Sequence, residues 1–90
     1  MDKKIIKAEH FGCHGQDLIS VNELVKYINN SNGYINISSH NSNTIIEKAT
    51  ACIDNDILIV KNENSRMLTP YENITNVRLF ELTIFIDLKL

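Results

Sequence analysis

The spacing of apolar residues changes at Gly33, and this change constrains the fold more than any other feature of the sequence. Before Gly33, four apolar residues recur at the spacing of a helix that buries one face: Val21, Leu24, Val25 and Ile28. After it, apolar and polar residues alternate with the period of two that is typical of strands. The sequence therefore predicts one helix followed by a unit built of strands.

The predicted helix covers residues 20–32 and carries its own start and stop signals. Ser20 and Glu23 have the spacing of a capping box, in which each side chain accepts a hydrogen bond from a backbone N–H at the helix start. The asparagine-rich run 29–32 and Gly33 end the helix, because these residues readily adopt the left-handed conformation of a helix C-terminus. Local sequence thus predicts both ends of this element.

Five strands are predicted after the helix, at residues 34–38, 44–53, 57–61, 67–79 and 82–90. The segment 44–53 has apolar residues on both faces, which indicates a long strand with a strong bend. The segment 57–61 begins with four apolar residues, and this run is typical of a strand that is buried on both faces. Pro70 cannot donate to a ladder and interrupts 67–79, so one 3-10 turn is expected over 70–73.

Length, charge and cysteine content limit the class of protein and of partner. A chain of 90 residues with 43% hydrophobic residues is one small globular domain. Its formal net charge is −2 and its nine lysines and arginines are scattered, so we expect at most weak binding to nucleic acid. The chain begins with a charged segment, has no apolar run longer than four residues and contains only Cys13 and Cys52. We therefore expect a cytoplasmic protein with free thiols and without a membrane segment.

A helix followed by five short strands, with a helical turn before the last strand, resembles the Sm-like proteins among the small SH3-like barrels. Asp54 stands where the Sm pattern has an aspartate before its third strand, and Asn73-Ile74 resembles the Asn-Ile/Val end of its second motif. The family's glycine in the first strand turn is replaced by residues 41–43, and its Arg-Gly by residues 69–72. Because the missing residues shape the family's uridine pocket, the resemblance implies the fold and not RNA binding.

The resemblance implies a mostly β (α+β) fold, in which an N-terminal helix is followed by a five-stranded small barrel of the SH3-like or Sm-like type. The first 19 residues are expected to lie outside the barrel: Ile5, Ile6 and Ala8 form a short patch that could pair as an edge strand, and 11–19 is a turn-bearing connection. The expected organisation is a single domain over 1–90, with a lead-in and loop at 1–19, the helix at 20–32 and the barrel at 33–90.

The segment 9–14 (Glu-His-Phe-Gly-Cys-His) is the one cluster that resembles a chemical site. His10, Cys13 and His14 are residue types that bind zinc, but a structural zinc site needs about four ligands, usually in two separated pairs. Cys13 could act as a nucleophile beside a histidine, but the sequence offers no evident orienting group and no oxyanion pocket. We therefore expect a polar loop here, and no catalytic, cofactor-binding or metal-binding residues in the chain.

Three functions from different classes remain open. The leading hypothesis is a non-enzymatic small β-barrel module that acts through protein–protein interaction, as an accessory or inhibitor protein of a bacterium or a phage would. The second is an Sm-like RNA-binding protein, whose RNA-facing residues would be Lys48, Lys61, Arg66 and Arg78. The third is a small metal- or thiol-dependent enzyme that uses the two histidines and the cysteine of segment 9–14.

The last predicted strand indicates self-association. Five of its side chains form one apolar face, and Phe85 lies on the opposite face and also needs cover. A strand that is apolar on both faces, placed at the edge of a sheet, pairs readily with a neighbouring copy. We therefore expect a homo-oligomer, with a dimer favoured. The expected interface consists of Leu82, Ile84, Phe85, Ile86 and Leu88.

Overall fold

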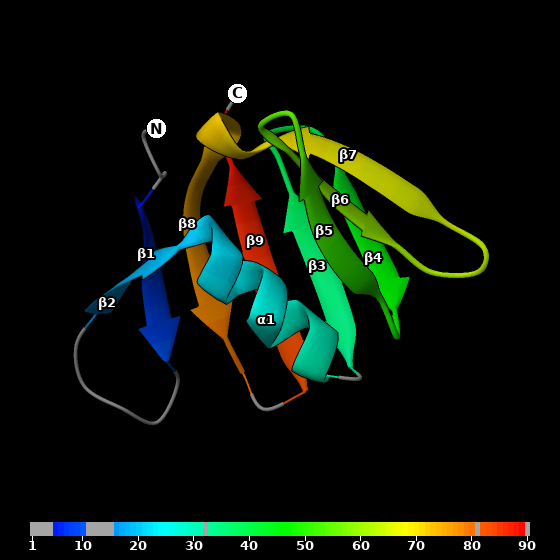
Figure 1. The fold of residues 1–90 in the computed structure, drawn as a ribbon, viewed down its shortest axis with the longest axis horizontal. Helices are drawn as coiled ribbons and strands as arrows, with labels where there is room; N and C mark the ends of the chain where they lie inside the picture. Colours follow the sequence, from blue (N-terminus) through cyan, green and yellow to red (C-terminus); the bar gives the residue numbers. More distant parts are fainter. Residues whose placement is uncertain (1–4, 11–15, 32, 81, 90) are drawn as a thin grey trace.

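The computed structural model describes residues 5–10, 16–31, 33–80 and 82–89, with residues 10, 16 and 17 described by their backbone alone. These residues form nine strands, one α-helix and one 3-10 turn (Figure 1). In chain order the elements are β1 (Ile5–His10), β2 (Gln16–Ser20), α1 (Val21–Ser31), β3 (Tyr34–Ser38), β4 (Asn43–Glu47), β5 (Thr50–Asp54), β6 (Ile57–Lys61), β7 (Arg66–Pro70), η1 (Tyr71–Asn73), β8 (Ile74–Leu79) and β9 (Thr83–Leu88).

The strands form two sheets. The larger sheet has six strands in the order β2-β1-β8-β9-β3-β4, and the smaller sheet has three in the order β5-β6-β7. Neighbouring strands are antiparallel except in two pairs: β1 runs parallel to β8, and β3 runs parallel to β9. The parallel pairs join segments that are far apart in the sequence: Ala8 lies opposite Val77, and Ile35 lies opposite Ile84. The first and last strands therefore both lie inside the larger sheet.

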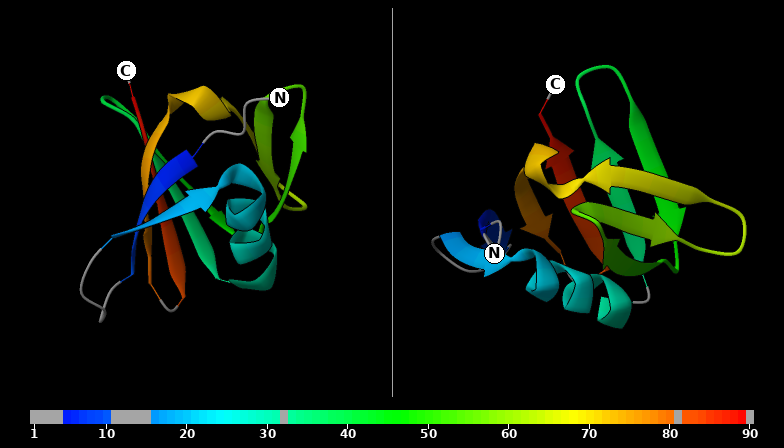
Figure 2. Two further views of the ribbon diagram at one scale, coloured as in Figure 1. Left: turned by 60° about the vertical axis from the view of Figure 1, so that its left-hand side comes forward. Right: turned by 45° about the horizontal axis from the view of Figure 1, so that its top comes forward.

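The hydrophobic core lies between the six-stranded sheet and a second layer, in which α1 lies beside the three-stranded sheet (Figure 2). Strand alternation turns one face of each sheet toward this core. Burial of their apolar surface is the main force that holds the two layers together. The largest fully buried side chains are Ile6, Leu24, Ile28, Ile35, Ile37, Ile46, Leu58, Ile74, Ile86, Val60 and Val77.

The predicted helix is confirmed as α1, and its capping box is formed. The backbone N–H of Ser20 donates to Oε1 of Glu23 (3.2 Å), and the N–H of Glu23 donates to Oγ of Ser20 (3.2 Å). These bonds satisfy N–H groups that have no partner inside the helix. No helix in the described part of the chain is long and apolar enough to cross a membrane.

Asn29, in the last turn of α1, attaches the helix to the outer edge of β5. Its Oδ1 accepts a hydrogen bond from the backbone N–H of Ala51 (2.7 Å), and its Nδ2 donates to the carbonyl oxygen of Ala51 (3.1 Å). A side-chain amide offers one donor and one acceptor, as the peptide group of a neighbouring strand does. Asn29 therefore provides hydrogen-bond partners for the backbone N–H and C=O of Ala51 at the edge of β5, where the smaller sheet has no further strand.

The predicted bent strand over 44–53 is two strands, β4 and β5, which belong to different sheets. The chain turns at Lys48, which has a positive φ of 50°. The N–H of Lys48 donates to the carbonyl oxygen of Gly33 (2.8 Å) and fixes this corner. The expected change of buried face occurs here, since Ile46 is buried before the corner and Ala51 after it. The corner carries the chain from one layer to the other.

The interruption at Pro70 is confirmed, because β7 ends at this residue and η1 follows it. Two backbone hydrogen bonds mark the ends of the β6–β7 ladder. The N–H of Asn62 donates to the carbonyl oxygen of Ser65 (2.9 Å), and the N–H of Tyr71 donates to the carbonyl oxygen of Asp56 (3.1 Å). Bonded and non-bonded pairs alternate along an antiparallel ladder. Pro70 falls in a non-bonded pair with β6, where its missing N–H is not needed.

The same alternation determines which groups of β7 face away from β6. Met67 and Thr69 fall in bonded pairs, so their N–H and C=O groups point toward β6. Arg66 and Leu68 fall in non-bonded pairs, so their N–H and C=O groups point outward. Strand β7 is therefore the edge of the smaller sheet that no other described strand covers.

The predicted fold class is wrong in two respects, although strands are the main secondary structure as expected. The helix is not N-terminal, because the β1–β2 hairpin precedes it, and the strands form sheets of six and three instead of a five-stranded barrel. The supposed lead-in contributes Ile6, Ala8 and Ile19 to the core. Strand β1 pairs with β8 near the other end of the chain, and periodicity within a short window carries no information about such a partner. The barrel implied by the Sm-like resemblance is thus not formed.

Candidate interaction surfaces

The outer face of the six-stranded sheet is not covered by any described element, because α1 and the smaller sheet both lie on the opposite face (Figure 2). Parallel strands are usually covered on both faces, yet both parallel pairs of this sheet have one open face. An open face on such a sheet is a candidate interaction surface. The side chains that alternation places on this face of strands β8, β9, β3 and β4 include Tyr34, Asn36, Ile45, Arg78, Phe85 and Asp87.

Phe85 lies at the centre of this face and is held by its neighbours. The guanidinium of Arg78 lies over the ring of Phe85, at 4.8 Å from the ring centre. The ring of Phe80 packs edge-on against Phe85, with 5.2 Å between ring centres and 70° between ring planes. Nη2 of Arg78 donates to Oδ1 of Asp87 (3.1 Å), while its Nε is buried without a hydrogen-bond partner among the described residues. These contacts fix the aromatic ring in one orientation.

Apolar side chains extend from Phe85 toward the connection between β8 and β9. Leu82 is 64% exposed and Tyr34 is 45% exposed. The N–H of Tyr34 donates to the carbonyl oxygen of Leu82 (2.9 Å), and Tyr34 lies opposite Thr83, two residues before Phe85. Side chains in such diagonal positions are within reach of one another. Tyr34, Phe80 and Phe85 therefore form one surface, which we call the aromatic patch, and the exposed Leu82 lies at its border in the β8–β9 connection.

The outer face of the three-stranded sheet is a second candidate surface. The strand register places three rows of side chains on it, each crossing β5, β6 and β7 in turn. The middle row is apolar and the two end rows contain charged residues of opposite sign. The rows are Thr50-Lys61-Arg66, Cys52-Ile59-Leu68 and Asp54-Ile57-Pro70.

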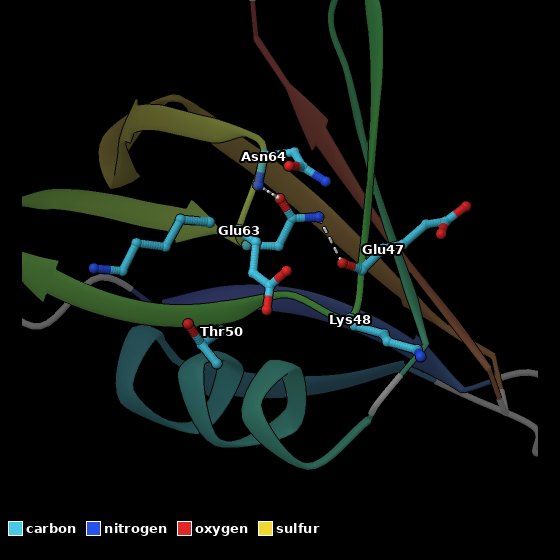
Figure 3. Close-up of a pocket in the computed structure, with 7 residues that line it drawn as sticks. Glu47, Lys48, Thr50, Glu63 and Asn64 are labelled. Atoms are coloured by element: carbon cyan, nitrogen blue, oxygen red, sulfur yellow. Dashed lines mark hydrogen bonds between the residues drawn. The ribbon is translucent and has the colours of Figure 1, made fainter.

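A shallow polar cleft separates the β4–β5 corner from the β6–β7 hairpin (Figure 3). Asn62 holds the hairpin in place, because its Nδ2 donates to the carbonyl oxygen of Glu47 (2.8 Å) and its Oδ1 accepts the N–H of Asn64 (2.8 Å). In Figure 3 the side chains of Glu47 and Lys48 point away from Glu63. The charged groups of the cleft therefore do not converge on one point, as catalysis or anion binding would require. The cleft is lined by Glu47, Lys48, Thr50, Lys61, Asn62, Glu63 and Asn64.

The four residues predicted to face RNA do not share one surface. Lys48 and Lys61 line the polar cleft together with two glutamates. Arg66 lies opposite Lys61 on the smaller sheet. Arg78 lies on the outer face of the larger sheet, where it forms an ion pair. The structure thus brings three of the four residues near one another and separates the fourth.

The cluster in segment 9–14 falls largely outside the described residues. Cys13 and His14 lie outside them, and His10 is described only by its backbone, as the last residue of β1. Whether these three side chains meet therefore stays a prediction. In the part of the chain that the structure describes, no group of three or more His, Cys, Asp or Glu side chains is placed to hold a metal ion. Cys52 is a free, exposed thiol.

The predicted interface on the last strand is divided between two sides of β9. Ile84 and Ile86 are buried in the protein's own core, and Leu88 packs against that core. Phe85 lies in the aromatic patch, and Leu82 is exposed at its border. Strand β9 lies between β8 and β3, so it is not an edge strand and has no free edge to pair with a second copy.

Sequence reasoning missed Phe80 and the contact between Arg78 and Phe85. Phe80 falls in a connection, where no periodicity indicates its direction. The pairing of Arg78 with Phe85 follows from the antiparallel register of β8 and β9, which an alignment of these two adjacent segments could have predicted. The outward direction of Tyr34 was indicated by its alternation with Ile35.

Comparisons with protein-family models, with curated proteins and with solved structures find no match to this chain. The Sm-like resemblance is therefore neither supported nor refuted by them. The two candidate surfaces are therefore the features of the described residues that bear on function.

Proposed function

We propose that this protein is a non-enzymatic binding module that acts through protein–protein interaction, and that the aromatic patch contacts its partner. The observation that carries the proposal is the position of Phe85 in the middle of an open sheet face, fixed between Arg78 and Phe80. Protein interfaces are enriched in aromatic residues and arginine, and a few such residues supply most of the binding energy. A ring that is already fixed loses little conformational entropy when a partner covers it.

The surroundings of the patch also suit a protein interface. Asn36 lies directly opposite Phe85 on β3, Asp87 lies two residues farther along β9, and both are partly exposed. Beyond Asn36 lies Ile45 on the edge strand β4, which is 57% exposed. An apolar centre surrounded by polar side chains is the usual composition of a protein-binding surface.

A protein suits the charges of this face better than a nucleic acid. The one arginine beside the aromatic patch, Arg78, is paired with Asp87 at 3.1 Å. Lys7, Glu9 and Glu47 lie on the same face, so lysine and glutamate alternate there without a basic stripe. Aromatic rings that stack on bases are normally accompanied by positive charge that follows the phosphate backbone.

The role we propose is that of an accessory or inhibitor protein of a bacterium or phage, acting in the cytoplasm. The exposed thiol of Cys52 would stay reduced in that compartment. A module of this size would act by covering a surface of a larger partner through the aromatic patch.

Photo-crosslinking in cells of the source organism tests this proposal. A photoreactive phenylalanine analogue replaces Leu82 at the border of the patch or, as a matched control, Tyr27, an exposed aromatic residue on α1. We expect a discrete protein adduct at position 82 and none at position 27, and we expect Tyr34→Ser to reduce the yield at position 82. Adducts of equal yield at both positions, or adducts that a ribonuclease removes, would contradict the proposal.

A further inference from the structure

We propose that the outer face of the three-stranded sheet is a self-association surface, and that its occupant is a second copy of this chain. The surface is formed by the three rows of side chains from β5, β6 and β7. It lies on the opposite side of the molecule from the aromatic patch, because each outer face points away from the shared core (Figure 2). Self-association through it is therefore independent of the proposed partner.

Strand β6 is apolar on both faces. Leu58 and Val60 point inward and are fully buried, whereas Ile57 and Ile59 point outward and are half-buried. Leu68, beside Ile59 on β7, is 51% exposed. A central strand with two apolar faces is typical of sheets that are covered on both sides. No described element packs on this outer face, so the described part of the chain does not supply the cover (Figure 1).

The charges at the two ends of the outer face of the three-stranded sheet are opposite in sign, so they are complementary to each other. Lys61 and Arg66 form the row next to the β6–β7 loop, and Asp54 lies in the row at the opposite end. Asp56 follows in the adjoining turn, where its Oδ1 accepts a hydrogen bond from the hydroxyl of Tyr71 (2.6 Å). The face is therefore basic at one end, apolar in the middle and acidic at the other end.

Such a face is complementary to itself in one orientation. A two-fold axis that runs along the middle row turns the second copy face to face and reverses its strands. The basic row of each copy then lies over the acidic row of the other, and the apolar row packs on its own equivalent. The alternative axis, along the strands, would place like charges over one another. The charge pattern thus selects a two-fold dimer with its axis along Cys52, Ile59 and Leu68.

The size of the face limits the affinity. Three strands spaced by about 4.8 Å, with five residues each at about 3.4 Å, cover roughly 14 by 17 Å. This footprint is well below the ~800 Å² per partner of a standard stable interface. We therefore expect a weak dimer, with a dissociation constant of about 10–100 µM.

Sedimentation velocity between 5 and 500 µM tests the surface. The wild-type chain is expected to shift from monomer to dimer over this range, and Leu68→Glu is expected to weaken dimerisation at least about tenfold. Ile45→Glu is the matched control, since Ile45 is as exposed as Leu68 but lies on the larger sheet. A wild-type monomer at 500 µM, or an equal loss of dimer in both variants, would overturn the proposal.

Charge reversal tests the orientation. In the proposed dimer Lys61 lies beside Asp54 of the second copy, and the two-fold symmetry repeats this contact. Lys61→Glu therefore places two negative charges together at both contacts, and Asp54→Lys places two positive charges together at both. Each single variant is expected to weaken dimerisation at least about tenfold, and the double variant is expected to return to within about threefold of wild type. A double variant that is as weak as the two single changes combined would rule out this orientation.

Crosslinking through Cys52 gives an independent measure of the axis. The axis along the middle row places Cys52 of one copy opposite Cys52 of the other, within reach of a short bis-maleimide when the sheets stack about 10 Å apart. In a Cys13→Ser chain, a crosslinked dimer is expected to form at 200 µM and to be lost in the Leu68→Glu variant. Its absence where sedimentation detects dimer would contradict the proposed axis.

Discussion

Replacing Asn29 with alanine is expected to destabilise the protein by about 2 kcal/mol. The change removes two hydrogen bonds to the backbone of Ala51, at 2.7 and 3.1 Å, each of which contributes about 1 kcal/mol net. The peptide groups of the buried Ala51 lose their partners, which adds to the cost. Alanine favours the helix over asparagine by about 0.5 kcal/mol, which offsets part of the loss.

Urea unfolding followed by far-UV circular dichroism measures this change. For a domain of this size, 2 kcal/mol corresponds to a fall of about 1–2 M in the urea midpoint. Protein at about 1 µM lies at least about tenfold below the dissociation constant expected for the proposed dimer, so most chains are monomeric and association contributes little to the measured free energy of unfolding.

Asn30→Ala is the matched control, because it makes the same chemical change on the same turn of α1. Asn30 is exposed and its side chain makes no hydrogen bond with the described residues. The control is therefore expected to be as stable as wild type or slightly more stable. Equal midpoints for the two variants would refute the idea that Asn29 satisfies the edge of β5.

Three further substitutions test individual contacts by thermal unfolding. Thr69→Val is expected to raise stability by about 1 kcal/mol, because Oγ1 of Thr69 is buried and has no hydrogen-bond partner among the described residues; a lower melting temperature would contradict this. Ser20→Ala is expected to cost about 1 kcal/mol, since it removes the acceptor for the N–H of Glu23, and an unchanged melting temperature would show that the capping box contributes nothing. Gly33→Ala is expected to cost about 3 kcal/mol, because the added Cβ would collide with the backbone carbonyl of Leu82; a loss below about 1 kcal/mol would mean that the backbone yields easily.

The elements that local chemistry determines were predictable from the sequence. The capping box of Ser20 and Glu23 lies within a single turn, and the break at Pro70 follows from a missing N–H. Strands β3 and β9 were located by alternation within windows of a few residues, which is the range over which alternation is informative. Strand β6 was located by its apolar run, whereas β4 and β5 were predicted as one bent strand.

The sheet order was not predictable, because it depends on contacts between distant segments. Nothing near Ala8 indicates that it lies opposite Val77, and nothing near Ile84 indicates that it lies opposite Ile35. Without these pairings β1 resembles a lead-in and β9 resembles an edge strand. The five-stranded barrel and the interface along the last strand both followed from that error.

The candidate surfaces were predictable in part. The apolar run of β6 predicted a strand that is buried on both faces, but only Leu58 and Val60 on its inner face are fully buried. The alternation of Tyr34 with Ile35 indicated which side of β3 faces out. Lys61 and Asp54 lie at opposite ends of one sheet face. Predicting this arrangement requires the register of three strands, which cannot be read from the sequence. Phe80 in the aromatic patch required the structure of the β8–β9 connection.

Amide hydrogen exchange measured by NMR tests most directly the central claim, that β9 lies inside a six-stranded sheet and leaves two separate outer faces. An interior strand has all of its N–H groups bonded, whereas an edge strand has every second one free. We predict slow exchange at residues 84–88 of β9, and fast exchange at Arg66 and Leu68 of the edge strand β7 between slow Met67 and Thr69. Alternating fast and slow amides along residues 84–88 would place β9 at an edge and contradict the account.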